Sequence, residues 1–344
     1  MGISFKELLT NVGANKVVDP VVSFCWDNSL AEEAAEGDRS PHGRKWNVSF
    51  HASEWPDPEY PCPRAAGYQM MDLGSMNTER WLNQTAEVGK AIELAQVRKV
   101  RDSGRLARSN VPGTSTDPEA RDENNEPMPQ IGFIDKEHWL TGSVDLPLMV
   151  FNQDHKPHIV EIKSKWVEHI EAMQKGERKA DTKHIRQLKC SLGMAHKAKN
   201  AFLHPTEDRV LDPPDDGSIY YIARDSPWIR GNTEVPTHEF YFKHDEGFME
   251  EGYANFKIFK KAFLEDVLVT EVERRNSRSH PLGWMWSKGA CQYCSFKKVC
   301  KADYEAGITT LSDTTGSEEA RKTRKDYDPK VVRQDVLDFW DSVE

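Results

Sequence analysis

The stretch GSVDLPLMVFNQDHKPHIVEIK, residues 142–163, contains two strand-like patterns joined by a polar turn. The second pattern is rich in β-branched residues, and residues 152–157 before it predict a hairpin turn. Because side chains alternate along a strand, Glu161 and Lys163 are expected on one face, with Ile162 on the other. The hairpin returns the chain, so Asp145 is predicted to lie beside Glu161.

Two carboxylates and a lysine on neighbouring strands form a group suited to the hydrolysis of a phosphodiester. Carboxylate oxygens bind hard divalent cations, and the lysine supplies a positive charge to the attacking water or to the phosphate. The alternative interpretation is a solvated surface, because a glutamate and a lysine on an exposed strand face commonly form a weak ion pair.

The order of Asp145 followed by Glu161-Ile162-Lys163 resembles the PD-(D/E)XK nuclease superfamily. The resemblance implies an α/β fold with a restriction-endonuclease-like core, in which a mixed central sheet is flanked by helices. Carried over to this chain, it implies that Asp145 and Glu161 bind one or two Mg or Mn ions, with the Ile162 carbonyl as a further ligand. Lys163 would orient or polarise the water or the scissile phosphate.

Three thiols lie close together at Cys291, Cys294 and Cys300, in the pattern C-x-x-C-x5-C. The N-terminus has no basic segment followed by an apolar one, so no secretory signal is evident. Clustered thiols in such a chain indicate a metal site rather than disulfides.

Cys62, in Pro61-Cys62-Pro63-Arg64, is the candidate for a fourth ligand. This segment, with a tyrosine after it and a C-x-x-C-x5-C far downstream, resembles the iron–sulfur RecB-like nucleases, which include the AddB nuclease domain and the CRISPR-associated and phage RecB-like exonucleases. The resemblance implies a 4Fe-4S cluster that joins the N- and C-terminal regions. Zinc is the alternative, because four thiolates suit a tetrahedral zinc site equally well. Cys25 and Cys190 are expected to be reduced core cysteines.

Apolar residues at helical intervals predict an amphipathic helix over residues 183–195, after the Glu161–Lys163 strand. RecB-like nucleases carry a Q-x-x-x-Y motif on this helix, with its glutamine beside the active site. Gln187 matches the glutamine and would support the site, whereas the tyrosine position is Ser191, which removes any role for an aromatic side chain there.

A second amphipathic helix is predicted over residues 79–100. RecB-like nucleases usually show a glycine on this helix and, four residues later, a histidine that reaches the metal. After Gly89 that position is Glu93, and a carboxylate is a natural substitute because Mg and Mn prefer oxygen ligands. An ordinary solvated glutamate is the alternative interpretation of Glu93, and Glu87 is the alternative ligand.

The chain is polar, with a net charge of −10, and hydrophobic residues make up 38% of it. No apolar run approaches the roughly 20 residues that a membrane-spanning helix requires. We therefore expect a cytoplasmic protein, in a bacterium or a phage-infected host cell, that does not engage membranes. The segment from Lys163 to Lys199 contains ten Lys and Arg residues but only four Asp and Glu residues. This segment and the basic run at residues 98–108 suit a groove that follows DNA phosphates.

The chain is expected to divide into five regions. Residues 1–50 form an N-terminal extension, and residues 51–78 form an arm that carries Cys62. The nuclease core spans residues 79–274, the C-terminal cluster segment spans residues 275–304, and a polar tail spans residues 305–344. Within the core, residues 109–130 read as a polar loop, 218–224 and 237–242 as strands, and 247–274 as a helix. Residues 307–329 are expected to be flexible, and residues 331–340 to form an amphipathic helix that docks on this chain or on a partner protein.

Together these patterns predict a Mg- or Mn-dependent deoxyribonuclease, an exonuclease by resemblance, with a structural metal–thiolate cluster. The alternative prediction is a catalytically inactive RecB-like fold that acts as a DNA-binding or assembly protein. The intact set of Asp145, Glu161 and Lys163 favours the enzyme. The absent histidine at Glu93 and the absent tyrosine at Ser191 favour the alternative.

Overall fold

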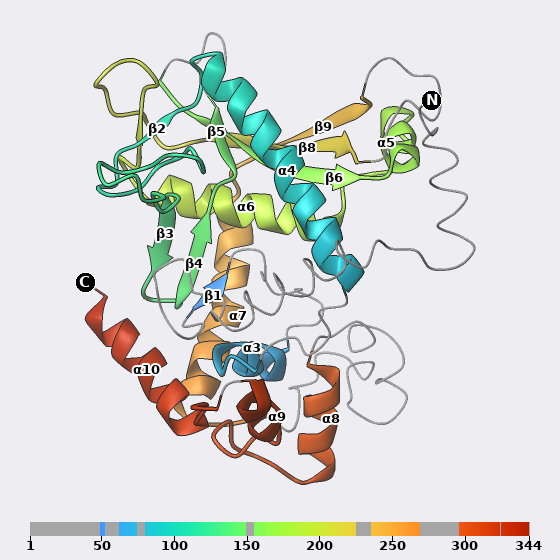
Figure 1. Ribbon diagram of the computed structural model, residues 1–344, viewed down its shortest axis with the longest axis vertical. Coiled ribbons are helices and arrows are strands. Elements are labelled where there is room, and N and C mark those ends of the chain that lie inside the picture. The colour runs from blue at the N-terminus through green and yellow to red at the C-terminus, as the bar shows by residue number, and fades with distance from the viewer. Residues whose placement is uncertain are drawn as a thin grey trace, which may run out of the picture.

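The computed structural model describes residues 49–51, 62–73, 80–148, 155–224, 235–268, 296–323 and 325–343 (Figure 1). Residues 1–48 and three of the cysteines, Cys25, Cys291 and Cys294, lie outside this part of the chain. So does the side chain of Glu87.

A four-stranded mixed sheet carries residues 146–148 and 158–163 of the 142–163 stretch. Its order is β5 (Leu146–Leu148), β6 (His158–Lys165), β8 (Asp216–Ala223) and β9 (Thr237–Lys243). β6 and β8 run parallel, and the two outer pairs are antiparallel. The expected α/β class is confirmed, as are the strands predicted near 218–224 and 237–242.

A second sheet is connected to the first by a short covalent link between β4 and β5. It has the order β1 (Phe50–His51), β4 (Leu140–Ser143) and β3 (Gly132–Asp135). Only Val144 and Asp145 separate the end of β4 from the start of β5. The strand expected before the hairpin is therefore divided between two sheets, and Asp145 lies at the junction. A two-stranded antiparallel pair, β2 (Arg108–Ser109) and β7 (Phe202–Leu203), lies where the polar 109–130 segment begins.

Two helices cover opposite faces of the four-stranded sheet (Figure 1). α4 (Arg80–Asp102) packs through Val97 against Val160 and Ile162. α6 (Thr182–Lys197) packs on the other face, where a Cβ on Gly217 would lie 3.0 Å from the Leu188 side chain. Parallel strands need a crossover connection, and α5 (Val167–Gln174) and α6 provide it between β6 and β8.

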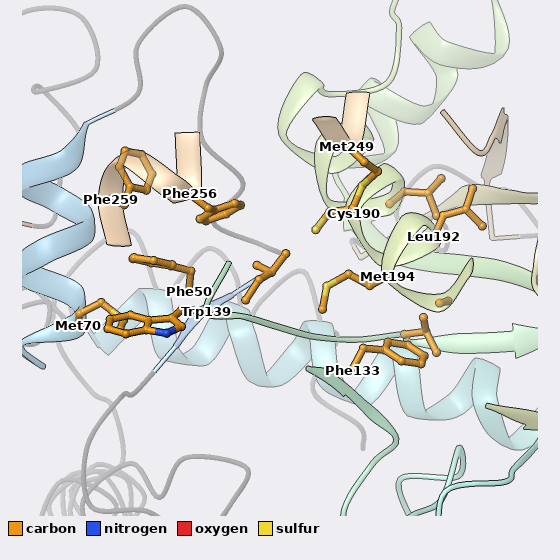
Figure 2. Packing of buried hydrophobic residues seen from close by; sticks show 14 of the residues in the cluster. Phe50, Met70, Phe133, Trp139, Cys190, Leu192, Met194, Met249, Phe256 and Phe259 are labelled. Carbon is orange, nitrogen blue, oxygen red and sulfur yellow. The ribbon is translucent and has the colours of Figure 1, made fainter. Parts of the chain in front are cut away.

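The hydrophobic core extends along α7 (Glu246–Leu264), from α6 at one end to α3 (Pro63–Met70) at the other (Figure 2). Met249 lies beside the α6 residue Cys190, whereas Phe256 and Phe259 surround Phe50 with ring centroids 5.3 and 5.8 Å away. Large buried side chains from distant segments thus form one continuous core.

α7 ends ten residues earlier than the helix predicted over 247–274. Asp266 adopts the left-handed conformation, with a φ of 55°, and the described chain continues to Leu268 without a helix. Its carboxylate accepts a hydrogen bond from the backbone N–H of Ser312, at 3.1 Å. A tertiary contact therefore stabilises the helix end, in the absence of the glycine that normally signals one.

The segment expected to be flexible packs against the molecule where the structure describes it. It contains α9 (Gly316–Thr323) and the buried side chains of Leu311 and Tyr327, so the prediction for residues 307–329 is wrong. The final amphipathic helix is present as α10 (Pro329–Ser342) and docks on this chain, with Trp340 stacked on Trp139 at 5.8 Å. No helix in the described ranges combines the length and apolar character needed to cross a membrane.

Candidate active site

Asp145 lies where the chain leaves one sheet and enters the next. The register of β5 and β6 pairs Leu146 with Val160, so Asp145 and Glu161 face each other one position further along the two strands. The backbone N–H of Ile162 donates to Asp145 Oδ2 at 3.2 Å, which holds the carboxylate against β6. The antiparallel pairing of β5 and β6, as predicted, thus brings the two acids side by side, and residues 149–154 of the expected hairpin lie outside the described part of the chain.

Glu161 and Lys163 share the α6 face of β6, as strand alternation predicts. Lys163 Nζ forms an ion pair with Glu161 and lies 3.8 Å from Asp145 Oδ2. Glu161 is 1% exposed, whereas the side chain of Lys163 is 22% exposed. The interpretation of this pair as an ordinary solvated surface is therefore wrong, because the glutamate is fully buried.

Burial raises the pKa of Glu161 to about 8, and the neighbouring charge of Asp145 adds to the increase despite the opposing effect of Lys163. Burial also disfavours the charged form of Lys163, but the carboxylates of Glu161 and Asp145 outweigh it and raise the pKa of the lysine. Two acids and one base confined in this way have an excess of negative charge when both acids ionise. A second cation would relieve it.

Glu93 reaches the neighbourhood of this group from α4. A Cβ on Gly89 would lie 3.8 Å from Ser164 Oγ, so α4 passes close to β6 one turn before Glu93. The charge of Glu93 contributes to the raised pKa of Lys163. Within the described ranges, however, no three or more His, Cys, Asp and Glu side chains form a ready metal site, so Glu93 does not complete one with Asp145 and Glu161.

Gln187 is half-buried on α6, the helix that covers the Glu161 face of the sheet. One turn earlier, His184 was not predicted from the sequence, and its Nδ1 lies 2.8 Å from the hydroxyl oxygen of Tyr221. Tyr221 is the neighbour of Lys163 in the β6–β8 register. Burial, together with the charges of Lys163 and Lys165, lowers the pKa of His184 to about 4, so this imidazole is neutral at pH 7.

Several residues of the two basic runs pair with acids of the same chain. In the first run, Arg98 pairs with Glu119, and Arg101 lies 3.1 Å from both Asp117 and Glu119. In the second, Lys165, Lys189 and Lys197 each pair with an aspartate. The polar 109–130 segment thus supplies acids that cover the first run, and the prediction of a continuous phosphate-tracking surface is weakened there.

Trp166, which is exposed, stacks on the half-buried Arg224 just beyond the Glu161–Lys163 pair. Trp166 follows β6, is 49% exposed, and has the Arg224 guanidinium 4.2 Å from its ring centroid. Neither residue was identified from the sequence. The sequence did contain a sign of them, because Lys165 continues the alternation of Glu161 and Lys163, and a tryptophan follows it directly.

The described cysteines lie in two regions. Cys62 is exposed at the N-cap of α3, and Cys300 is half-buried on α8 (Lys297–Glu305). The two helices are in contact, because the Tyr68 and Phe296 rings lie 5.8 Å apart. Cys190 is buried in the core, as expected.

Comparisons with known proteins give only distant likenesses. No protein-family model matches the chain, and no curated protein does. The chain is similar to a crystal structure of LHK-Exo, an alkaline exonuclease from Laribacter hongkongensis, with 13% identity over 62% of this chain and 87% of that one, at a TM-score of 0.32. A structure of LHK-Exo in complex with dAMP gives 14% identity, the same coverage and a TM-score of 0.32.

A third likeness is to the crystal structure of SSO0001, with 13% identity over 82% of this chain and 96% of that one, at a TM-score of 0.38. At scores this low, an interpretation of the site has to rest on its own geometry.

Proposed function

We propose that this protein is a Mg- or Mn-dependent deoxyribonuclease, with an exonuclease as the expected type. The observation that carries the proposal is the group of Asp145, Glu161 and Lys163, which joins a fully buried carboxylate, a second carboxylate and a lysine at a strand junction. A purely structural ion pair needs one acid for one base. The additional acid, and the pKa of about 8 that it helps to give Glu161, favour a site that receives a divalent cation.

The donor atoms suit Mg or Mn, which take oxygen ligands and often use only one or two carboxylates together with substrate phosphates. Asp145 and Glu161 would hold the ion, with the Ile162 carbonyl and Glu93 as further ligands. The ion, when bound, lowers the pKa of water and stabilises negative charge on the phosphate. Lys163 would direct its ammonium at the attacking water or the scissile phosphate, and Gln187 would orient the group from α6.

DNA would approach the end of β6, where Lys163 leads to Lys165 and the Trp166–Arg224 stack. An exposed tryptophan backed by a guanidinium can stack on a base without regard to its identity. A stacking residue this close in sequence to Lys163 favours a substrate that presents unpaired bases, either a single strand or the frayed end of a duplex.

The first experiment is a cleavage assay with Mn on linear single- and double-stranded DNA. The Asp145→Asn variant is compared with the wild type, because asparagine keeps an oxygen that can accept the hydrogen bond from the Ile162 N–H while the negative charge is removed. We expect the variant to lose about 100-fold or more of the wild-type rate, the scale of losing a charge that stabilises the transition state. Equal rates in wild type and Asp145→Asn would contradict the proposal.

The second candidate function is a DNA-binding or assembly protein that does not cleave. It is favoured by one observation, which is that no ready three-ligand metal group exists in the described ranges. Binding of end-bearing DNA without cleavage, in either metal and with either DNA form, would identify this function instead.

Glu93→Gln tests the third carboxylate. If Glu93 binds the ion directly or through water, the variant should need about 10-fold more Mn for half-maximal activity, because a ligand's charge is lost while its size is kept. A Mn titration of the cleavage rate measures this. Asp102→Asn, at the C-terminal end of the same helix, is the control. Identical titrations for Glu93→Gln and wild type would make Glu93 an ordinary helix residue.

We also propose that Cys62, Cys291, Cys294 and Cys300 hold a 4Fe-4S cluster, with zinc as the alternative metal. The contact between α3 and α8 supports it, because these helices carry the first and last of the four thiols. The described donors fit a metal–thiolate centre, since neither Cys62 nor Cys300 is in a disulfide. Such a centre would cross-link distant parts of the chain and take no part in the hydrolysis.

A further inference from the structure

A buried polar cluster centred on Asp303 joins α3 to the C-terminal part of the chain. Asp303 is completely buried. Its Oδ2 accepts from the Tyr68 hydroxyl at 2.8 Å and from the Thr314 hydroxyl at 2.6 Å. Its Oδ1 accepts from the backbone N–H of Thr315 at 2.6 Å and from the hydroxyl of the same residue. A carboxylate has about four lone-pair sites, so this one is saturated.

Arg64 is buried beside the cluster, and only part of its guanidinium is satisfied. The residue is 2% exposed. Its Nη2 lies 3.4 Å from the Tyr68 hydroxyl, whereas Nε and Nη1 are buried and have no hydrogen-bond partner in the described part of the chain. Asp303 cannot serve them, because its acceptor sites are taken. Buried donors of a charged group are costly when unpaired, so an acceptor is expected at this position.

The position of Arg64 identifies the kind of acceptor. It follows Cys62 by two residues, within the first turn of α3. Its Nη2 donates to the Tyr68 hydroxyl, which in turn donates to Asp303, and Asp303 follows Cys300 by one turn of α8. The buried cation therefore lies on α3 close in sequence to Cys62, and beside the part of α8 that carries Cys300.

We propose that Arg64 is a positioning residue for an anionic metal–thiolate centre, to whose sulfur atoms its Nε–H and Nη1–H groups donate. This inference rests on the cluster proposed above. Four thiolates around iron or zinc leave a net negative charge, and a buried guanidinium would offset it while its planar donors fix the sulfur positions. Hydrogen bonds to sulfur also set the reduction potential of an iron–sulfur cluster.

The test compares Arg64→Met, Arg64→Lys and wild type, all purified anaerobically as the full chain. Metal content is measured first, followed by the rate of metal release to EDTA and, if the metal is iron, by the reduction potential. We expect Arg64→Met to release metal about 10- to 100-fold faster, the range seen when partners of metal ligands are lost. Its potential should become more negative. The metal-release rate and the potential of Arg64→Lys should lie between those of the wild type and Arg64→Met, because lysine keeps the positive charge but lacks the planar guanidinium.

Arg121→Met, which removes an exposed arginine from the 109–130 segment, is the matched control and should behave as wild type. Removing one buried charge can destabilise a fold, so thermal denaturation is compared for all variants. Arg64→Lys, which keeps the charge, supplies the comparison if Arg64→Met does not fold. Wild-type release rates and potential in metal-loaded Arg64→Met would overturn the role of Arg64 and leave the cluster intact. A wild-type protein without metal on its thiols would overturn both.

Discussion

Replacing Lys163 by alanine is expected to lower the rate of DNA cleavage by about 100- to 1000-fold while the protein stays folded. The lysine is the only cation that the described residues place against both Asp145 and Glu161, and it remains 22% exposed, open to a substrate phosphate. In the proposed reaction, its removal would delete positive charge at the point where the pentacoordinate phosphate gains negative charge. Glu161 can compensate for the loss in the free protein by keeping its proton, because its pKa is already raised.

Single-turnover cleavage of end-labelled DNA at saturating Mn measures the effect, with thermal denaturation as the check on folding. Lys165→Ala is the matched control, since Lys165 lies on the same face of β6 two residues further on and pairs with Asp181 instead. We expect that control to lose no more than a few-fold. If Lys163→Ala cleaves at the wild-type rate, Lys163 is a structural counter-ion and the proposed chemistry is wrong.

The second large effect is expected for Cys62→Ala, which should reduce the bound metal from full occupancy to almost none. For iron this means a change from about four atoms per chain, in a brown protein, to a colourless one. The proposed cross-link from Cys62 to the C-terminal thiols would close a loop of more than 200 residues, and closure of a loop this long contributes about 5 kcal/mol in chain-entropy accounts. The variant should therefore also fold poorly.

Metal analysis and the midpoint of denaturation measure these two consequences separately. Cys190→Ala is the control, because Cys190 is buried in the core at α6 and should keep its metal content unchanged. A colourless wild-type protein with one zinc would overturn the iron assignment but keep the cross-link. Full metal occupancy in Cys62→Ala would overturn the cross-link itself.

The local features of the site were predictable from the sequence, and the long-range ones were not. Alternation along one strand and a polar turn were enough to place Asp145, Glu161 and Lys163 together. The burial of Glu161 was not predictable, because it depends on α6 covering that face of the sheet. His184 was also missed, since its only distinguishing feature is a contact with Tyr221, which lies on a strand more than thirty residues away.

The errors in the fold have the same origin. Residues 307–329 are polar on average, which suggested a flexible tail. A few apolar side chains such as Leu311 nevertheless find a place in a core built from earlier segments. The end of α7 depends on Asp266, whose left-handed backbone is stabilised by residues about fifty positions away. Periodicity over a short window contains no information about such partners.

The contacts of α3 with the distant end of the chain have a consequence for how the protein folds. The Tyr68 hydroxyl binds Asp303, and the Tyr327 hydroxyl donates to the Met71 carbonyl at 2.7 Å, across 235 and 256 residues respectively. Contacts of such sequence separation slow folding, because the entropy of closing the intervening chain is lost before they form. On the ribosome, α3 emerges early but cannot complete its packing until the residues around Tyr327 have been synthesised. An early helix of this protein therefore completes its packing only late in translation.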